Sequence, residues 1–144
     1  MSETLGDFLL VRAGPLRLGF PLDQVVEVSE LGSVHSVPSH APALRGVTVS
    51  RGRVVPLVHL GALLGSEGIP DQQSGTAVLT ALGGHAVCLE VDEADVITRE
   101  ELLPVPANEP IPWALAVVRR DDGLIPILNL GALAERLANR EPDA

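Results

Sequence analysis

The sequence predicts a mainly β protein built from a pair of small barrels that are related by pseudo-twofold symmetry. Two observations support this prediction. Short apolar runs alternate with Gly and Pro along most of the chain, which is typical of short strands joined by tight turns. The pattern of these runs also begins again after about 70 residues, which indicates an internal repeat.

Four pairs of apolar runs, each separated by a turn sequence, are expected to form hairpins. In chain order they are Phe8–Arg12 with Leu16–Phe20, Gly46–Ser50 with Arg53–Val58, Val78–Leu82 with Ala86–Val91, and Leu115–Val118 with Leu124–Leu128. The turns between them contain Gly14-Pro15, Arg51-Gly52, Gly83-Gly84 and Asp122-Gly123. Gly and Asp-Gly favour such turns because they accept the positive φ that tight hairpins require.

Shorter elements fill the rest of the first half. Val34–Val37 is predicted to be a short strand that ends at Pro38. Leu60–Leu64 is expected to form one or two helical turns, closed by Gly65. The polar stretch 66–75 is rich in Gly, Pro, Asp and Gln, and it is expected to be a loop between the two halves.

Two further helical segments are predicted in the second half. Thr98-Arg-Glu-Glu101 has the Thr-x-x-Glu form of a capping box and suggests one helical turn. Leu130, Leu133 and Leu137 fall at helical spacing, so a C-terminal helix is expected with Asn129 as its N-cap. The tail from residue 139 onward is expected to fray.

The repeat is clearest where Val55-Pro-Leu-Val-His-Leu-Gly-Ala-Leu63 is matched by Ile125-Pro-Ile-Leu-Asn-Leu-Gly-Ala-Leu133. Each half supplies too little apolar surface to be stable alone, so the two are expected to share a core within a single domain, 1–144. The expected subdomains are roughly 16–75 and 76–138, and the sequence leaves open whether the N-terminal strand crosses over. A groove between the halves is a favoured place for a partner.

Composition excludes several classes of function. The net charge of −9 argues against binding nucleic acid or anionic lipid, both of which attract clustered Lys and Arg. Aromatic residues are limited to Phe8, Phe20 and Trp113, which disfavours stacking on sugars or bases. The acidic start does not resemble a secretory signal, and no apolar run is long enough to cross a bilayer. With its single cysteine, the chain is expected to be cytoplasmic.

No residue set predicts catalysis, a metal site or a cofactor. The histidines lack zinc spacing, the serines lack a nucleophile elbow, and Cys88 lies mid-strand as an expected core residue. The clustered acids are expected to form a solvated turn. These residues are His35, His40, His59 and His85; Ser29, Ser36 and Ser50; and Asp92, Glu93 and Asp95. A small enzyme or ligand binder on paired barrels is therefore the weakest alternative, since no nucleophile–base pair is present.

Four ordered segments resemble the CheW-like family. The first, 46–60, is similar to the family signature Gly-Val-x-Asn-Leu-Arg-Gly-x-Val-Val-Pro-Val-Val-Asp-Leu. The others are Leu22-Asp23 followed by Val25-Val-Glu-Val28; Val91-Asp92, Val96 and the stretch 98–106 with its Pro-x-Pro; and Ile125-Pro-Ile-Leu-Asn-Leu130. Together they cover roughly residues 7–137.

The resemblance implies two five-stranded SH3-like barrels with short helices. It also implies a non-catalytic adaptor that joins the cytoplasmic tip of chemoreceptors to the regulatory domain of a chemotaxis histidine kinase. The receptor-facing positions that match the family pattern are Val25, Glu27, Val28, Arg51 and Gly52. Apolar Val25 and Val28 would take up a receptor helix, and Arg51 would bind carboxylates or carbonyls on its surface. Arg45 is a weaker second candidate.

The chain departs from the signature near these positions. Asn-Leu of the signature is replaced by Val49-Ser50, and the Asp before the last Leu is replaced by His59. A second hypothesis therefore stays open: an adaptor of this family that serves a pathway other than chemotaxis, or that binds only one of the usual partners.

Overall fold

The structure is a computed structural model, and it describes residues 5–38, 43–65, 69, 75–82, 84–108, 110–120 and 123–140. The first half contains β1 (Leu5–Ala13), β2 (Leu16–Pro21), the 3-10 turn η1 (Leu22–Gln24), β3 (Val25–Glu30), β4 (Val34–His35), β5 (Leu44–Ser50), β6 (Arg53–His59) and α1 (Leu60–Leu63). The second half contains β7 (Thr76–Leu82), β8 (His85–Val91), β9 (Glu93–Glu101), β10 (Ala114–Arg120), β11 (Gly123–Leu128) and α2 (Leu130–Arg140).

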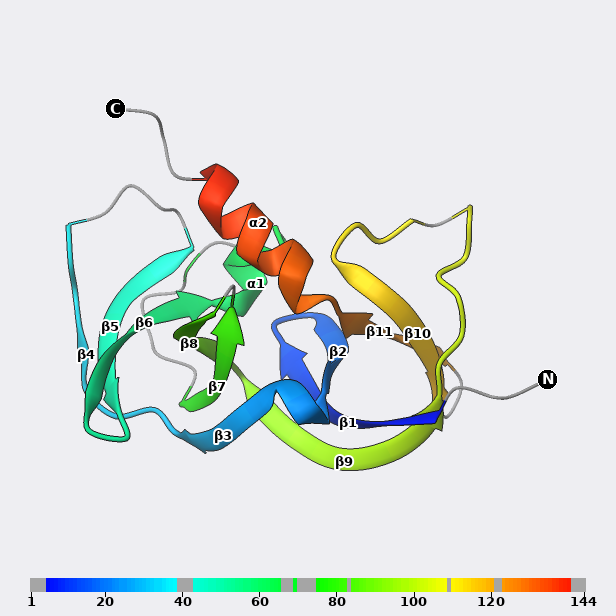
Figure 1. Cartoon of the computed structure of the whole chain (residues 1–144), viewed down its shortest axis with the longest axis horizontal. Helices are drawn as coiled ribbons and strands as arrows, with labels where there is room; N and C mark the ends of the chain where they lie inside the picture. The colour runs from blue at the N-terminus through cyan, green and yellow to red at the C-terminus, as the bar shows by residue number, and fades with distance from the viewer. Residues whose placement is uncertain are drawn as a thin grey trace.

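The strands form two mixed sheets that lie side by side (Figure 1). One sheet has five strands in the order β10-β11-β2-β1-β9, and the other has six in the order β3-β7-β8-β6-β5-β4. The mainly β prediction is confirmed, and so are all four hairpins. The sixth strand is the two-residue β4, which lies within the short strand expected at Val34–Val37.

Each sheet contains strands from both halves of the sequence. β1 and β2 pair with β9 and β11, while β7 and β8 pair with β3 and β6. The expected division of the chain near residue 75 therefore does not follow the sheets. The physical reason is that the β1–β2 and β7–β8 hairpins exchange places, so that each completes the sheet of the other half.

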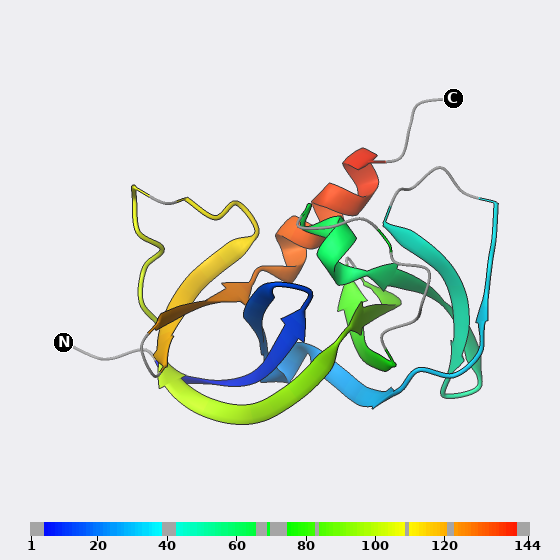
Figure 2. The same ribbon diagram turned by 180° about the vertical axis from the view of Figure 1, so that it is seen from behind.

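Both sheets curve back on themselves, as the view from behind also shows (Figure 2). In the six-stranded sheet the chain passes from β3 to β4 over three residues, and β4 then pairs with β5. In the five-stranded sheet, an antiparallel bridge between Leu103 and Val117 links the end of β9 to β10. Closing the sheets in this way leaves few exposed strand edges.

The internal repeat is confirmed in the strand register. Val47 lies opposite Pro56 in the first half, and Val117 lies opposite Pro126 in the second. The register also shifts at matching places, between Leu44 and Gly46 and between Ala114 and Ala116. The same side-chain pattern thus produces the same bulged hairpin twice.

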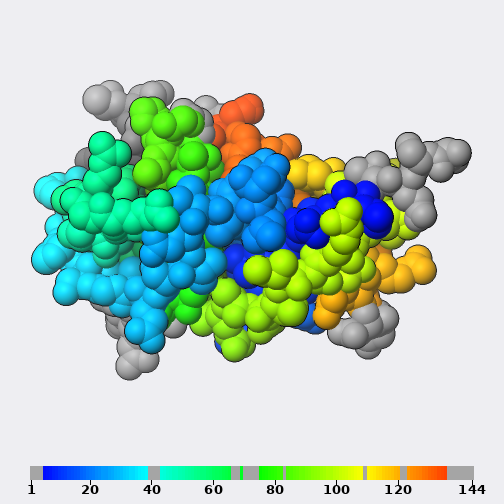
Figure 3. Space-filling view, turned by 60° about the horizontal axis from the view of Figure 1, so that its bottom comes forward, coloured from blue at the N-terminus to red at the C-terminus, as the bar shows by residue number. Residues whose placement is uncertain are grey.

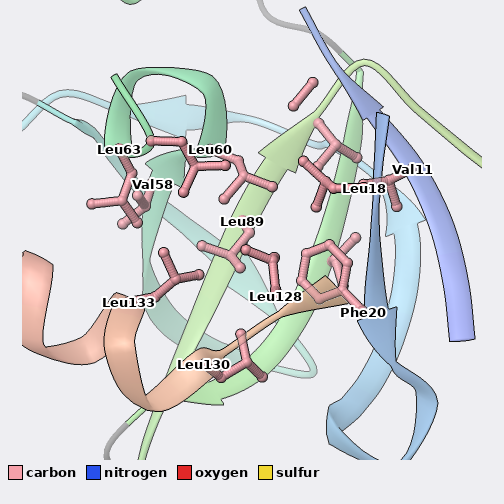
Figure 4. Packing of buried hydrophobic residues seen from close by; sticks show 14 of the residues in the cluster. Val11, Leu18, Phe20, Val58, Leu60, Leu63, Leu89, Leu128, Leu130 and Leu133 are labelled. Atoms are coloured by element: carbon pink, nitrogen blue, oxygen red, sulfur yellow. The ribbon is translucent and has the colours of Figure 1, made fainter. Parts of the chain in front are cut away.

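The main core lies between the two barrels and draws on both halves (Figure 4). It combines Val11, Leu18 and Phe20 with Val58, Leu60, Leu63, Leu89, Leu128, Leu130 and Leu133. Each barrel has a smaller cluster of its own, such as Phe8 with Ile127 in one and Leu57 with Cys88 in the other. Helix α2 lies above the junction of the two barrels (Figure 1), and no described helix is long and apolar enough to span a bilayer.

Equivalent side chains cap the two helices. The Asn129 Oδ1 atom accepts a hydrogen bond from the Ala132 amide at 3.1 Å, and the His59 Nδ1 atom accepts one from the Ala62 amide at 3.1 Å. The backbone amides of Asn129 and His59 bond to Trp113 and Ala43, respectively, at 2.8 Å. The predicted N-cap at Asn129 is confirmed, and His59, which stands where the family signature has Asp, caps α1 in the same way.

The capping box expected at Thr98–Glu101 is wrong, because these residues lie in β9. Thr98 is opposite Phe8 and Arg99 is opposite Asp7 in the ladder with β1. Pairing with β1 therefore overrides the local preference, and the Thr98 hydroxyl bonds to Glu100 on the same face of the strand instead of to a helix amide.

We expect Asn129→Ala to lower the free energy of unfolding by about 1 kcal/mol, because the Ala132 amide loses its cap. Asn129→Asp should keep the stability close to that of the wild type, since a carboxylate caps equally well. Urea denaturation followed by circular dichroism measures both. A wild-type midpoint for Asn129→Ala would contradict the assigned cap.

Candidate functional site

Strand β3 exposes two apolar side chains to solvent. Val26 and Val28 are 48% and 41% exposed. Val25 and Glu27 are half-buried. A bulge between Val25 and Glu27 shifts the register against β7. The strand therefore presents a short apolar edge at the surface of the six-stranded barrel.

The turn between β5 and β6 places an arginine in an unusual backbone conformation. Arg51 and Gly52 have φ values of 54° and 76°, which are typical of a tight two-residue hairpin turn. Among the described residues, Arg51 is the one non-glycine residue with positive φ. Gly or Asn would adopt this conformation at lower cost, so the turn geometry alone does not favour an arginine at this position.

An ion pair joins this turn to β3. The Arg51 Nε atom lies 2.7 Å from the Glu27 Oε1 atom, although β7, β8 and β6 separate β3 from β5 in the sheet order. The pair is partly solvated, with 61% of the Arg51 side chain and 37% of the Glu27 side chain exposed, so its contribution to stability is small. Figure 3 shows the hairpin tip (teal) against β3 (blue) on one face of the molecule.

A shallow hollow of about 290 Å³ lies beside this apolar edge. Its lining combines Val28, Ser29 and Glu30 of β3 with Thr76 of β7 and Ala94 of β9. Since β9 belongs to the five-stranded barrel, the hollow lies between the two barrels. We refer to Val26, Val28, Arg51, Gly52 and this hollow together as the β3 rim.

The structure thus brings together four of the five residues singled out in the sequence: Glu27, Val28, Arg51 and Gly52. Val25 is placed differently, because it packs against the main core and offers little surface to a partner. Val26 takes the outward position instead, and the sequence reasoning missed it. Strand alternation could not have identified Val26, because the bulge between Val25 and Glu27 breaks the alternation of β3. Partner binding at the rim stays a prediction.

Arg45, the second candidate, has a structural role. Its side chain is 10% exposed and its Nε atom lies 2.5 Å from Oε1 of the fully buried Glu90. The pair connects β5 of the first half with β8 of the second half. A partner protein cannot easily reach a guanidinium that is buried in this way, and removing it would leave a carboxylate without its cation.

Cys88 and the histidines are the other residues considered for catalysis or metal binding. Cys88 is buried in β8, where burial raises the pKa of its thiol; the nearby Glu27 carboxylate adds to the rise and a hydrogen bond with Ser50 opposes it. A raised pKa makes the thiol a poor nucleophile. Among the described residues, no three His, Cys, Asp or Glu side chains gather as metal ligands. His40 lies outside the described residues.

Asp92, the first residue of the acidic cluster, is hydrogen-bonded to the β1–β2 turn. The Asp92 Oδ2 atom accepts hydrogen bonds from the Gly14 amide at 2.6 Å and from the Arg12 guanidinium at 3.2 Å. Arg12 also bonds to Glu93 at 3.1 Å, whereas Asp95 is exposed. The expected solvated turn is therefore wrong for Glu93 and Asp95, which lie in β9 because this segment pairs with β1, and Asp92 fixes the β1–β2 turn.

The structure thus combines two barrels around a common core with an exposed apolar strand beside an arginine. The CheW-like domain model matches residues 7–138, so the chain belongs to the CheW-like domain family, a family of non-catalytic adaptors.

Individual relatives agree with this membership. The chain is 27% identical over 140 residues to the chemotaxis protein CheW of Klebsiella aerogenes. The matched region covers 94% of this chain and 78% of the relative. It is 39% identical over 54 residues to the protein FrzA of Myxococcus xanthus, covering 38% and 34% of the two chains. The crystal structure of the scaffolding protein TtCheW from Thermoanaerobacter tengcongensis has the same fold, with a TM-score of 0.77, 18% identity, and coverage of 92% and 89%.

On the five-stranded barrel, Arg120 bonds to two side chains of β9. The Arg120 Nη1 atom donates to the Thr98 Oγ1 atom at 2.8 Å and to the Glu100 Oε2 atom at 3.1 Å. The Thr98 hydroxyl donates to the same Glu100 oxygen at 2.7 Å. The Thr98 hydrogen bond, and then that of Arg120, hold the pKa of Glu100 below its usual value.

We expect Thr98→Val to raise the pKa of Glu100 toward its usual value, because the hydroxyl donor is lost. Since the folded-state pKa of Glu100 is lowered, the stabilisation is present above the unfolded-state pKa and is lost as pH falls through the folded-state pKa. The variant should therefore be less stable than the wild type at neutral pH, and this difference should shrink in acid. Carboxyl-carbon NMR titration and urea denaturation test both points; an unchanged Glu100 titration would contradict the assigned hydrogen bond.

Proposed function

We propose that the chain is a cytoplasmic chemosensory coupling protein that joins the tip of chemoreceptors to the regulatory domain of a histidine kinase. The observation that most supports the proposal is the β3 rim, where two exposed valines, an arginine and a hollow between the barrels lie together. Family membership and the similarity to a chemotaxis protein CheW add to it.

The rim suits an α-helix as its partner. Val26 and Val28 are two residues apart on a strand, which separates them by about 6.6 Å. Residues four apart on a helix rise by about 6 Å, so successive apolar side chains on one helix face can meet both valines. Among the contacts of the described residues, Arg51 uses its Nε atom for Glu27, which leaves its terminal nitrogens for carboxylates or carbonyls on the helix.

A CheW-like adaptor of another pathway, or one that binds a single partner, is the second candidate. Val49 and Ser50 replace Asn-Leu of the signature beside the rim, and the similarity to FrzA extends over part of the chain. His59 does not favour either candidate, because it caps α1. A pull-down with the kinase regulatory domain separates the two: an absence of kinase binding, with receptor binding intact, would leave the second candidate.

Arg51→Glu should weaken binding to a receptor cytoplasmic fragment by about tenfold or more, since it replaces a cation that faces the helix. Stability should change by less than about 1 kcal/mol, because the ion pair with Glu27 is exposed. Calorimetric titration measures the affinity, and thermal denaturation measures the stability.

The charge-swapped variant Glu27→Arg/Arg51→Glu separates direct contact from positioning. The swap restores an ion pair between β3 and the hairpin, but it places the cation on β3. We expect binding to remain weak. Recovery of wild-type affinity would mean that the ion pair only holds the hairpin in place, and that Arg51 does not contact the partner.

A further inference from the structure

The six-stranded barrel is closed by the short stretch of chain that leads from β3 to β4. These two strands are the ends of the sheet order β3-β7-β8-β6-β5-β4, and residues 31–35, here called the closing segment, run from β3 through β4 (Figure 1). Val34 lies opposite Thr48 and His35 lies opposite Val47 in the ladder with β5. The closing segment therefore joins the two edges of the sheet.

Two hydrogen bonds and two apolar side chains anchor the closing segment. The Leu31 amide donates to the Gly75 carbonyl at 2.8 Å, and the Thr48 hydroxyl donates to the Ser33 carbonyl at 2.9 Å. Leu31 and Val34 pack against the small core cluster of the six-stranded barrel. Thr48 is 3% exposed. Its hydrogen bond fixes the segment, because a buried hydroxyl that is left unbonded costs free energy.

A glycine lets the closing segment approach β5 closely. A Cβ atom on Gly46 would collide with the carbonyl group of His35. The register of β5 against β6 also shifts between Leu44 and Gly46. The bulge and the missing side chain together make room for β4, which is held at a short and specific distance from β5.

This closure sets the distance between the two parts of the β3 rim. Glu27 lies on β3 and Arg51 lies on the β5–β6 turn, with three strands between β3 and β5 in the sheet order. The route through the closing segment is shorter, because β4 pairs directly with β5. Thr48 lies near the Arg51 end of β5, and its partner Ser33 follows shortly after β3 ends at Glu30. The Thr48 hydroxyl therefore links the two strands that carry the rim.

We propose that Thr48 is a positioning residue for partner binding. Its hydroxyl acts through the closing segment and holds β3 at the distance from the β5–β6 turn at which the β3 rim meets one helix. Thr48 is too buried to contact a partner itself. Without its hydrogen bond the closing segment opens more often, and the apparent affinity falls with the fraction of molecules that keep the closed rim. The inference rests on the proposed function of the rim.

The test compares Thr48→Val with the matched control Thr80→Val. The Thr80 hydroxyl is also buried and donates to the Val87 carbonyl at 3.3 Å, but this hydrogen bond joins β7 to β8, which already pair along their whole length. Both variants lose a buried hydroxyl, so both should be less stable in urea denaturation. In calorimetric titration with a receptor cytoplasmic fragment, Thr48→Val should bind about fivefold more weakly or worse, and Thr80→Val should stay within about twofold of the wild type. Thr48→Ser keeps the donor and should restore binding.

Two further readouts separate positioning from a general loss of stability. In the free chain, hydrogen exchange at the amides of β3 and of the closing segment should be faster in Thr48→Val and should keep the wild-type rate in Thr80→Val. In a double-mutant cycle, Thr48→Val should cause a smaller loss of affinity in the Arg51→Glu background than in the wild type, because the contact that it positions is already gone.

Wild-type receptor affinity of Thr48→Val, or equal losses from Thr48→Val and Thr80→Val, would overturn the inference and leave the proposed function intact. Unchanged exchange rates in β3 would overturn it as well. Failure of the wild-type chain to bind the receptor fragment would instead refute the proposed function, and the exchange rates would still show whether Thr48 holds β3. If circular dichroism shows that Thr48→Val does not fold, Val34→Ala takes its place with the same expected results, because it truncates a half-buried side chain of the same segment.

Discussion

Exchange of hairpins between the two halves is the constraint on which the rest of the structure depends. Because β1 and β2 complete the sheet of the second half, and β7 and β8 that of the first, neither half closes a barrel with its own strands. The main core consequently draws on both halves at once. Its buried leucines and valines hold the barrels together, and the buried ion pair between Arg45 and Glu90 connects β5 with β8.

The exchange also determines where the β3 rim lies. It brings β9 of one barrel beside β3 of the other, and their side chains line the hollow of the β3 rim. Each barrel has an arginine near the tip of its hairpin, but the two arginines do not occupy equivalent positions of the repeat, since Arg120 corresponds to Ser50. Arg120 is 29% exposed and bonds within its barrel, whereas Arg51 is 61% exposed and stands on a turn with positive φ.

Local features of the fold were predictable from the sequence, and features that depend on distant strands were not. The hairpins and the Asn129 cap follow from turn and capping residues. Thr98-x-x-Glu also looks like a cap, but pairing with β1 decides its conformation. The candidate site was located through its resemblance to a known family. The details of the site were not predictable, because a bulge breaks the alternation of β3 at Val26, and the Glu27–Arg51 contact spans three intervening strands.

The central claim is that a helical partner binds across the β3 rim. The most direct test is an NMR titration of the isotope-labelled chain with a receptor cytoplasmic fragment. The account predicts that the largest shifts occur at the amides of Val26, Val28, Arg51 and Gly52, with smaller shifts at Thr76 and Ala94. Shifts confined to α2 or to the β10–β11 hairpin, with the β3 amides unchanged, would contradict it.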